Sequence, residues 1–157
     1  MMDLREVMRR WVTGVTIVSV EQNGQLHGAT VSSLASISVD PPIITITLAR
    51  DSRTHQMLKE SRLFGVTLLA MGQQMLSDRF SGQVPDGHDR FAGVGFHYIY
   101  PQVPILNDGL AGLACRVIHQ YEMANSTLFA AEVLASELGE AQSPLVYVNR
   151  SYRRLEE

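Results

Sequence analysis

The sequence predicts a mainly β protein, an antiparallel barrel accompanied by a few short helices. Several short runs are rich in β-branched residues, among them 15–20 and 43–48. Asn23-Gly24 follows the first run and is a strong signal for a two-residue hairpin turn. Helical periodicity is confined to short stretches. Many strands joined by hairpins, with few helices, indicate an antiparallel barrel.

Composition is consistent with one globular domain, 1–157. The chain of 157 residues is long enough to bury a core, and its contents of 45% hydrophobic and 18% charged residues are ordinary. A net charge of −3 argues against a nucleic-acid surface. No apolar run approaches the length of a membrane span, and no signal-peptide core begins the chain, so we expect a cytoplasmic protein. The lone Cys115 lies in an alternating apolar run, which predicts a small buried residue.

The first third of the chain predicts a helix followed by strands. Apolar residues recur at three-and-four spacing over 4–12, as expected for an amphipathic helix laid on a core: Leu4, Val7, Met8, Trp11 and Val12. A strand over 15–20 then returns through the hairpin into a segment beginning at Gly28. Asp40-Pro41-Pro42 interrupts the sheet, because proline has no N–H for the ladder. The strand 43–48 follows.

The remainder predicts further strands and two short helices. Ser52 is placed to cap a helix that contains Met57 and Leu58, and Met71 to Phe80 suggests a second helix. Glycine and proline recur over 81–95, which predicts a loop. The extended segments expected, besides a strand over 64–69, are 96–100, 103–106, 111–122, 127–137 and 145–149. His119 lies in one of these alternating strands and is expected to be packed.

The segment from Gly28 to Pro42 is the strongest candidate for a ligand site. Bulky side chains are nearly absent from it, and its small or hydroxylated residues are Ala29, Thr30, Ser32, Ser33, Ala35, Ser36 and Ser38. A ligand could approach the main chain closely here, and the hydroxyls could donate or accept hydrogen bonds. A polar edge strand followed by a turn is the alternative explanation.

The second candidate is the loop that leads into the helix after Ser52. A helix start exposes unpaired N–H groups and the positive end of the dipole, so it can hold a phosphate. Arg50 and Arg53 favour an anion there, and Thr54 lies in the first turn. Asp51 is the opposing charge and is expected to point outward. Simple capping by Ser52 and Thr54, without a ligand, is the alternative.

Other reaction chemistries find no support in the sequence. The five histidines show no paired metal-ligand spacing, and we expect no metal site. No Walker-type phosphate loop, no G-x-G-x-x-G after a strand and no G-x-S-x-G elbow is present. The side chains alone supply no obvious redox group or nucleophile, which agrees with an enzyme that works through a cofactor.

These motifs together resemble the flavin reductase-like family, and the resemblance extends over nearly the whole chain. The segments that carry it, in order, are Thr13 to Val18, Gly28 to Pro42, Asp51 to Thr54, Phe64 to Val66, Phe80, Arg90-Phe91, Pro144 to Tyr147, Arg150 and Tyr152. The resemblance implies an antiparallel FMN-binding split β-barrel with Greek-key connections. It also implies an NAD(P)H-dependent flavin reductase that passes reduced FMN or FAD to a monooxygenase partner, and a homodimer with flavin at its seam.

The resemblance also implies roles for individual residues. Thr30, Val31, Ser32 and Ser33 would line the ribityl chain and the ring edge, while Ser36 and Ser38 would reach the N5–O4 edge of the ring. Ser52 and Thr54, helped by Arg50 or Arg53, would hold the phosphate. Arg90-Phe91 would end a loop near the flavin. Tyr147, Arg150 and Tyr152 would form the wall shared with the second chain; exposed rings at a strand end are the alternative for these.

One turn departs from the family pattern. Many members carry Gly-Asp-His in the long hairpin, with the histidine on the nicotinamide side. Here Asn125 stands in place of the aspartate and Ser126 in place of the histidine. A serine cannot stack or carry charge as imidazole does, although Ser126 could hydrogen-bond a carboxamide. A flavoprotein without nicotinamide turnover is therefore the second reading, and a non-catalytic barrel kept for assembly is the third.

Overall fold

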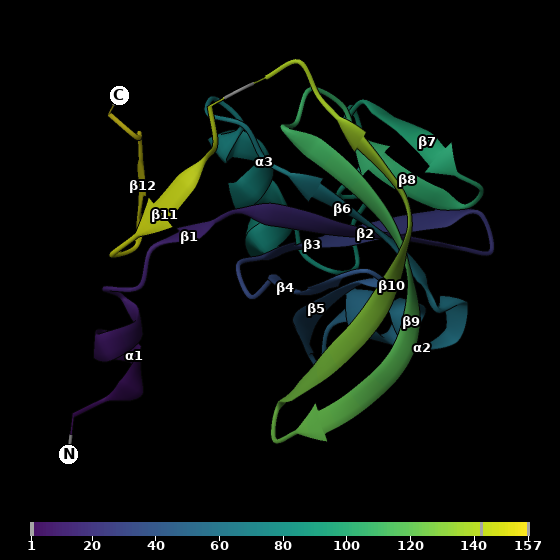
Figure 1. Ribbon diagram of the computed structural model, residues 1–157, viewed down its shortest axis with the longest axis horizontal. Coiled ribbons are helices and arrows are strands. Elements are labelled where there is room, and N and C mark those ends of the chain that lie inside the picture. The colour runs from purple at the N-terminus through teal and green to yellow at the C-terminus, as the bar shows by residue number, and fades with distance from the viewer. Residues whose placement is uncertain (1, 142, 157) are drawn as a thin grey trace.

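Seven antiparallel strands form the main sheet of the computed structural model, which describes residues 2–141 and 143–156 (Figure 1). Their order across the sheet is β3-β2-β6-β9-β10-β5-β4. The strands are β2 (Thr16–Gln22), β3 (Gln25–Val31), β4 (Ala35–Val39), β5 (Pro42–Ala49), β6 (Leu63–Leu68), β9 (Ala111–Met123) and β10 (Ser126–Leu138).

The main sheet is strongly curled. Its two edge strands, β3 and β4, lie at opposite ends of the strand order, yet only residues 32–34 separate them in the chain. Because so short a connection cannot cross a flat sheet, the two edges must approach each other at this point. The concave side encloses the main core, which includes Val18, Ile46, Phe64 and Phe129, all with no exposed surface.

Smaller elements complete the molecule. They are the helices α1 (Leu4–Met8), α2 (Arg53–Ser61) and α3 (Gln74–Asp78), the π-helical turn η1 (Arg79–Gln83), and the strands β1 (Thr13–Gly14), β7 (Phe96–Tyr100), β8 (Val103–Leu106), β11 (Val146–Val148) and β12 (Ser151–Arg153). β1, β11 and β12 form a three-stranded sheet, and β7 pairs with β8. Strand β8 lies so close to β6 that a Cβ at Gly65 would come within 2.2 Å of the Pro104 carbonyl oxygen. Glycine at this position therefore permits the packing of the two layers.

The expected hairpins and several strand boundaries are confirmed. Asn23 and Gly24 both have positive φ, 52° and 74°, as the tight turn between β2 and β3 requires. The strands over 96–100 and 103–106 are β7 and β8, and the long hairpin is β9 with β10. Cys115 is fully buried, and burial raises the pKa of its thiol to about 12. His119, however, is exposed on β9 rather than packed.

The amphipathic helix at the start of the chain differs from the expectation. Helix α1 ends at Met8, and Leu4, Val7, Met8 and Trp11 stay 47–70% exposed. Figure 1 shows α1 set apart from the main sheet, at the end of an arm with β1, β11 and β12. The periodicity identified an apolar face correctly, but no described part of the same chain covers it. Within residues 2–141 and 143–156, no helix combines the length and apolarity needed to cross a bilayer.

Candidate active site

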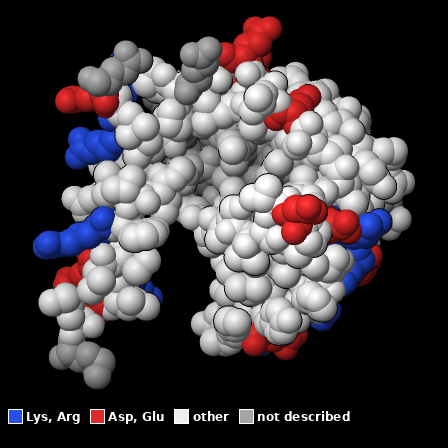
Figure 2. Space-filling view, in the orientation of Figure 1, with Lys and Arg blue, Asp and Glu red and all other residues white. Residues whose placement is uncertain are grey.

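A groove of about 570 Å³ runs between this terminal arm and the main sheet. Its walls come from α1 and the segment after it, the end of β3, the end of β5, the start of α2 and β11. The lining residues are Met8, Trp11, Thr13, Ala29, Thr30, Val31, Ser32, Ser33, Thr47, Leu48, Ala49, Ser52 and Tyr147. Figure 2 shows that this face of the molecule is hollowed beside the arm and that the atoms bordering the hollow are mostly uncharged.

The floor of the groove is the segment that the sequence singled out. Strand β3 ends at Val31, and residues 32–34 cross from there to the opposite edge of the sheet. Ser33 fastens this crossing to β5, because its Oγ accepts hydrogen bonds from the Thr47 N–H at 3.0 Å and the Thr47 hydroxyl at 2.7 Å. With small side chains over 29–33, a flat ligand can lie against the backbone. The structure thus brings Thr30, Val31, Ser32 and Ser33 together as expected.

A second hollow, of about 310 Å³, adjoins the first and shares Thr30, Ser32 and Tyr147 with it. Arg150, Asp78 and Tyr152 also line it. The Tyr152 hydroxyl donates to Asp78 Oδ1 at 2.6 Å, and burial together with this bond raises its pKa. Tyr152 therefore borders this adjoining hollow and not the main groove.

Ser52 connects the groove to the start of α2. Its Oγ accepts from the His55 N–H at 3.3 Å and donates to the Ala49 carbonyl at 2.8 Å, which confirms it as the N-cap. The same residue lines the groove. The positive end of the α2 dipole consequently lies at the end of the groove, where it favours an anion. Asp51 is exposed, in agreement with the expectation.

The arginines of this loop are already paired within the chain. Arg50 faces Glu122 at 3.5 Å and donates to the Ala124 carbonyl at 3.1 Å, so it reaches toward the β9–β10 turn. The Arg53 side chain donates to the Asp86 carbonyl at 3.2 Å and to Gln25 at 2.9 Å. Neither guanidinium lines the groove. In this structure both side chains are held by groups of the same chain, and their contact with a phosphate stays a prediction.

Thr54 and the Arg90-Phe91 pair also lie elsewhere than expected. The Thr54 side chain is fully buried, with Oγ1 2.8 Å from His27 Nδ1, so its hydroxyl does not reach the groove. Arg90 is 6% exposed and donates to the carbonyls of Gly28 at 2.8 Å and Phe80 at 3.2 Å. Phe91 packs edge-to-face on Phe80, with ring centroids 5.1 Å apart. These residues hold the loop 84–95 against the middle of β3, because their side chains face the interior.

The remaining candidates lie at the margins of the groove. Ser36 and Ser38 are on the edge strand β4, on either side of a register irregularity, and neither lines the groove. Ser126 begins β10 directly opposite Ala49, a groove residue, and the neighbouring Asn125 carbonyl accepts from the Arg50 N–H at 2.9 Å. The unusual turn is therefore beside the Ser52 end of the groove.

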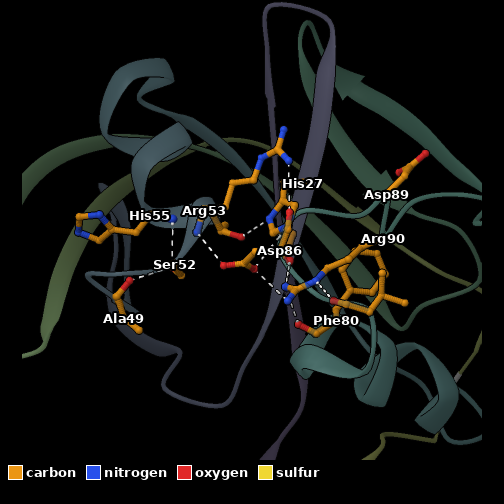
Figure 3. A network of polar contacts seen from close by, with 12 residues as sticks. His27, Ala49, Ser52, Arg53, His55, Phe80, Asp86, Asp89 and Arg90 are labelled. Carbon is orange, nitrogen blue, oxygen red and sulfur yellow. Dashed lines mark hydrogen bonds and ion pairs between the residues drawn. The ribbon is translucent and has the colours of Figure 1, made fainter.

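Sequence reasoning missed two polar residues next to this site, Asp86 and His27. The Asp86 carboxylate accepts from the Arg53 N–H at 3.2 Å and pairs with Arg90 at 3.0 Å (Figure 3). His27 is 1% exposed and faces the same carboxylate. Nothing in the spacing of Asp86 marked it, since its partners are far away in the chain. Across residues 2–141 and 143–156, no cluster of three or more His, Cys, Asp and Glu side chains is arranged to hold a metal ion.

We expect His27 to make the protein less stable in mild acid. Burial first, and the Arg90 charge second, lower the pKa of His27 from 6.5 to about 4. The unfolded chain takes up this proton below pH 6.5 and the folded chain does so only near pH 4. The contribution is therefore complete above pH 6.5 and is lost as the pH falls toward 4, by about 3 kcal/mol in total.

Urea unfolding between pH 7 and pH 4.5 measures this effect. His119→Gln is the control, because it removes a histidine that is exposed on β9. His27→Gln should flatten the curve over this range. Parallel curves for the wild type and His27→Gln would show that the histidine does not carry the effect.

Comparison with known proteins agrees with the site. The flavin reductase like domain family matches residues 8–156. The NADH-dependent flavin reductase StyB of Pseudomonas fluorescens is 35% identical over 141 residues, which cover 89% of this chain and 80% of that protein. The reductase component of 4-hydroxyphenylacetate 3-monooxygenase from Thermus thermophilus is 29% identical over 151 residues, 96% of this chain and 94% of that protein.

Solved structures show the same relationship. The styrene monooxygenase flavin reductase of Pseudomonas putida S12 superposes with a TM-score of 0.87 at 30% identity, covering 99% of both chains. The NADH:FAD oxidoreductase SgcE6 of Streptomyces globisporus C-1027 gives a TM-score of 0.91 at 29% identity, covering 98% of this chain and 92% of that chain. The groove, the capped start of α2 and the match over 8–156 agree, and the chain belongs to the flavin reductase-like family.

Proposed function

We propose that this protein is an NAD(P)H-dependent flavin reductase that supplies reduced FMN or FAD to a monooxygenase. The observation that carries the proposal is a groove with a floor of small side chains over 29–33, which ends at the capped start of α2. Relatives described as NADH-dependent flavin reductases and as monooxygenase reductase components support it. The domain would span 1–157, and its curled sheet would be the split barrel of the family.

The residues present fit a flavin. Backbone and small side chains from Thr30 to Ser33 would hold its ring edge and ribityl chain, and Ser52 with the start of α2 would take its phosphate end. Trp11 and Tyr147 are the aromatic side chains that line the groove, and they would cover the ring on the side of the arm. A bound flavin supplies the hydride chemistry, while the protein orients it and excludes competing reactions.

Homodimer formation would complete the groove. Trp11 lines it and is 67% exposed, and the apolar face of α1 has no cover within the described chain. A second copy seated on this arm would bury the α1 face and close the groove on its open side. Light scattering should give twice the mass of one 17.4 kDa chain; a monomer at working concentration would remove this part of the proposal.

Nicotinamide oxidation under argon tests the activity directly. We expect NADH or NADPH to be oxidised in the presence of FMN or FAD, followed by the loss of nicotinamide absorbance. The turn at Ser126, opposite Ala49, supports the alternative, because position 126 holds a serine and not a histidine. Protein that binds flavin and ignores both nicotinamides would favour the flavoprotein without turnover. Rapid reduction of bound flavin by either nicotinamide would exclude that alternative.

A further inference from the structure

The start of α2 already holds an anion, and that anion belongs to the protein. The Asp86 carboxylate accepts from the Arg53 N–H, the first amide of this nine-residue helix, at 3.2 Å. The Arg90 guanidinium lies 3.0 Å from its other oxygen. Figure 3 shows the carboxylate between these two donors and next to Ser52, the residue that lines the groove. The position proposed for the flavin phosphate is therefore occupied by a side chain of the protein itself.

A third group at this point, His27 Nε2, has no partner among residues 2–141 and 143–156. His27 Nδ1 is engaged with the Thr54 hydroxyl at 2.8 Å, while Nε2 is buried and forms no hydrogen bond with any of these described residues. If the Thr54 hydroxyl donates to Nδ1, the ring proton sits on Nε2. That N–H faces Asp86 Oδ1 at 3.7 Å, which is too long for a hydrogen bond. An unsatisfied donor aimed at an anion is costly when it is buried.

The three donors suit a phosphate better than a carboxylate. A carboxylate offers two oxygens, and here they serve the Arg53 N–H and Arg90. A phosphate monoester offers three terminal oxygens and more negative charge, so it could also serve His27 Nε2. The positive end of the helix dipole and the Arg90 guanidinium both face this position, and together they provide more positive charge than one carboxylate balances.

Of the groups that meet at the start of α2, the Asp86 carboxylate is the easiest to displace. Asp86 has a side chain 44% exposed and lies on the loop 84–95, whereas the helix start and His27 are held by the fold. Arg90 does not depend on it, because it also donates to the carbonyls of Gly28, Phe80 and Val84 at 2.7–3.2 Å. Departure of the carboxylate would leave the donors in place.

We propose that Asp86 is an internal substitute for the flavin phosphate, which displaces it from the start of α2 when a phosphorylated flavin binds. This proposal rests on the proposed function and adds a specificity determinant to it. FMN has to compete with a tethered carboxylate, whereas riboflavin, which has no phosphate, does not. Asp86 therefore reduces the difference in binding affinity between FMN and riboflavin, and it favours exchange of the bound flavin.

Flavin titrations of the full-length protein test the proposal. We expect Asp86→Asn to bind FMN about tenfold more tightly than the wild type, with riboflavin affinity unchanged. Asp89→Asn is the matched control, because it removes the same charge from the same exposed loop without touching α2, and it should leave both affinities unchanged. Inorganic phosphate should raise the Tm of Asp86→Asn more than that of the wild type, because a free phosphate can bind at the helix start once the carboxylate is gone. The comparison of FMN with riboflavin tests the phosphate that is attached to a flavin.

Equal or weaker FMN binding by Asp86→Asn would overturn the proposal. If this variant does not fold, hydrogen exchange in the wild type decides: FMN should speed amide exchange over 84–89 and riboflavin should not. Identical exchange with the two flavins would contradict displacement of Asp86. A wild-type protein that binds neither flavin would remove the proposed function and this inference together, whereas equal gains for FMN and riboflavin would remove the inference alone.

Discussion

We expect Ser32→Trp to lower kcat/KM for flavin by at least about a hundredfold while the protein stays folded. Ser32 is exposed and lines both the groove and the adjoining hollow, so an indole at this position would fill the space above the floor. Because the side chain points away from the core, the substitution removes no packing. Steady-state NADH oxidation at varied FMN concentration measures the effect.

The control for Ser32→Trp is Ser136→Trp. Ser136 is an exposed serine on β10 that lines neither hollow, so its replacement adds the same bulk away from the site. Both variants should keep the wild-type Tm within a few degrees. Full flavin reduction by Ser32→Trp would mean that the ligand binds elsewhere.

Arg90→Met should reduce the free energy of unfolding by about 3–5 kcal/mol. Arg90 is 6% exposed and bonds three main-chain carbonyls, so its loss leaves the Gly28, Phe80 and Val84 oxygens without their donor. The Asp86 carboxylate loses its closest cation as well. Denaturant unfolding measures the change, and the expected loss is a large part of the stability of a domain of this size.

Arg116→Met is the control for that measurement, because it removes the same charge from an exposed ion pair instead of a buried one. Arg116 on β9 pairs with Glu132 at 3.2 Å, but both side chains are 41–50% exposed, so this pair contributes less than about 1 kcal/mol. A similar, small loss for Arg90→Met would show that Arg90 acts at the site and not in holding the loop 84–95.

Local patterns in the sequence predicted several features of this structure correctly. Asn23-Gly24 predicted a hairpin correctly because only residues that tolerate positive φ fit that turn. Ser52 predicted the start of α2 because its side chain caps the helix within three residues. The small side chains of 29–33 predicted the floor of the groove, since their absence of bulk is visible without any fold.

Predictions that depended on the direction of a side chain fared worse. Thr54 lies two residues after the groove residue Ser52, but its side chain is buried and turned toward His27. Arg50 and Arg53 were expected at a phosphate, and carboxylates or carbonyls distant in the chain hold them elsewhere. The apolar face of α1 was recognised, but the sequence pattern does not say that it stays uncovered in one chain.

By itself, the sequence determined the strands, their hairpins, the helix cap and the stretch of backbone left free of bulk, because each depends on neighbours within a few residues. Tertiary structure alone decided that the terminal arm faces this stretch and that Asp86 reaches the start of α2 from 33 residues away. Such contacts arise when a curled sheet brings its two edges and their loops together, and no local preference encodes which charges then meet.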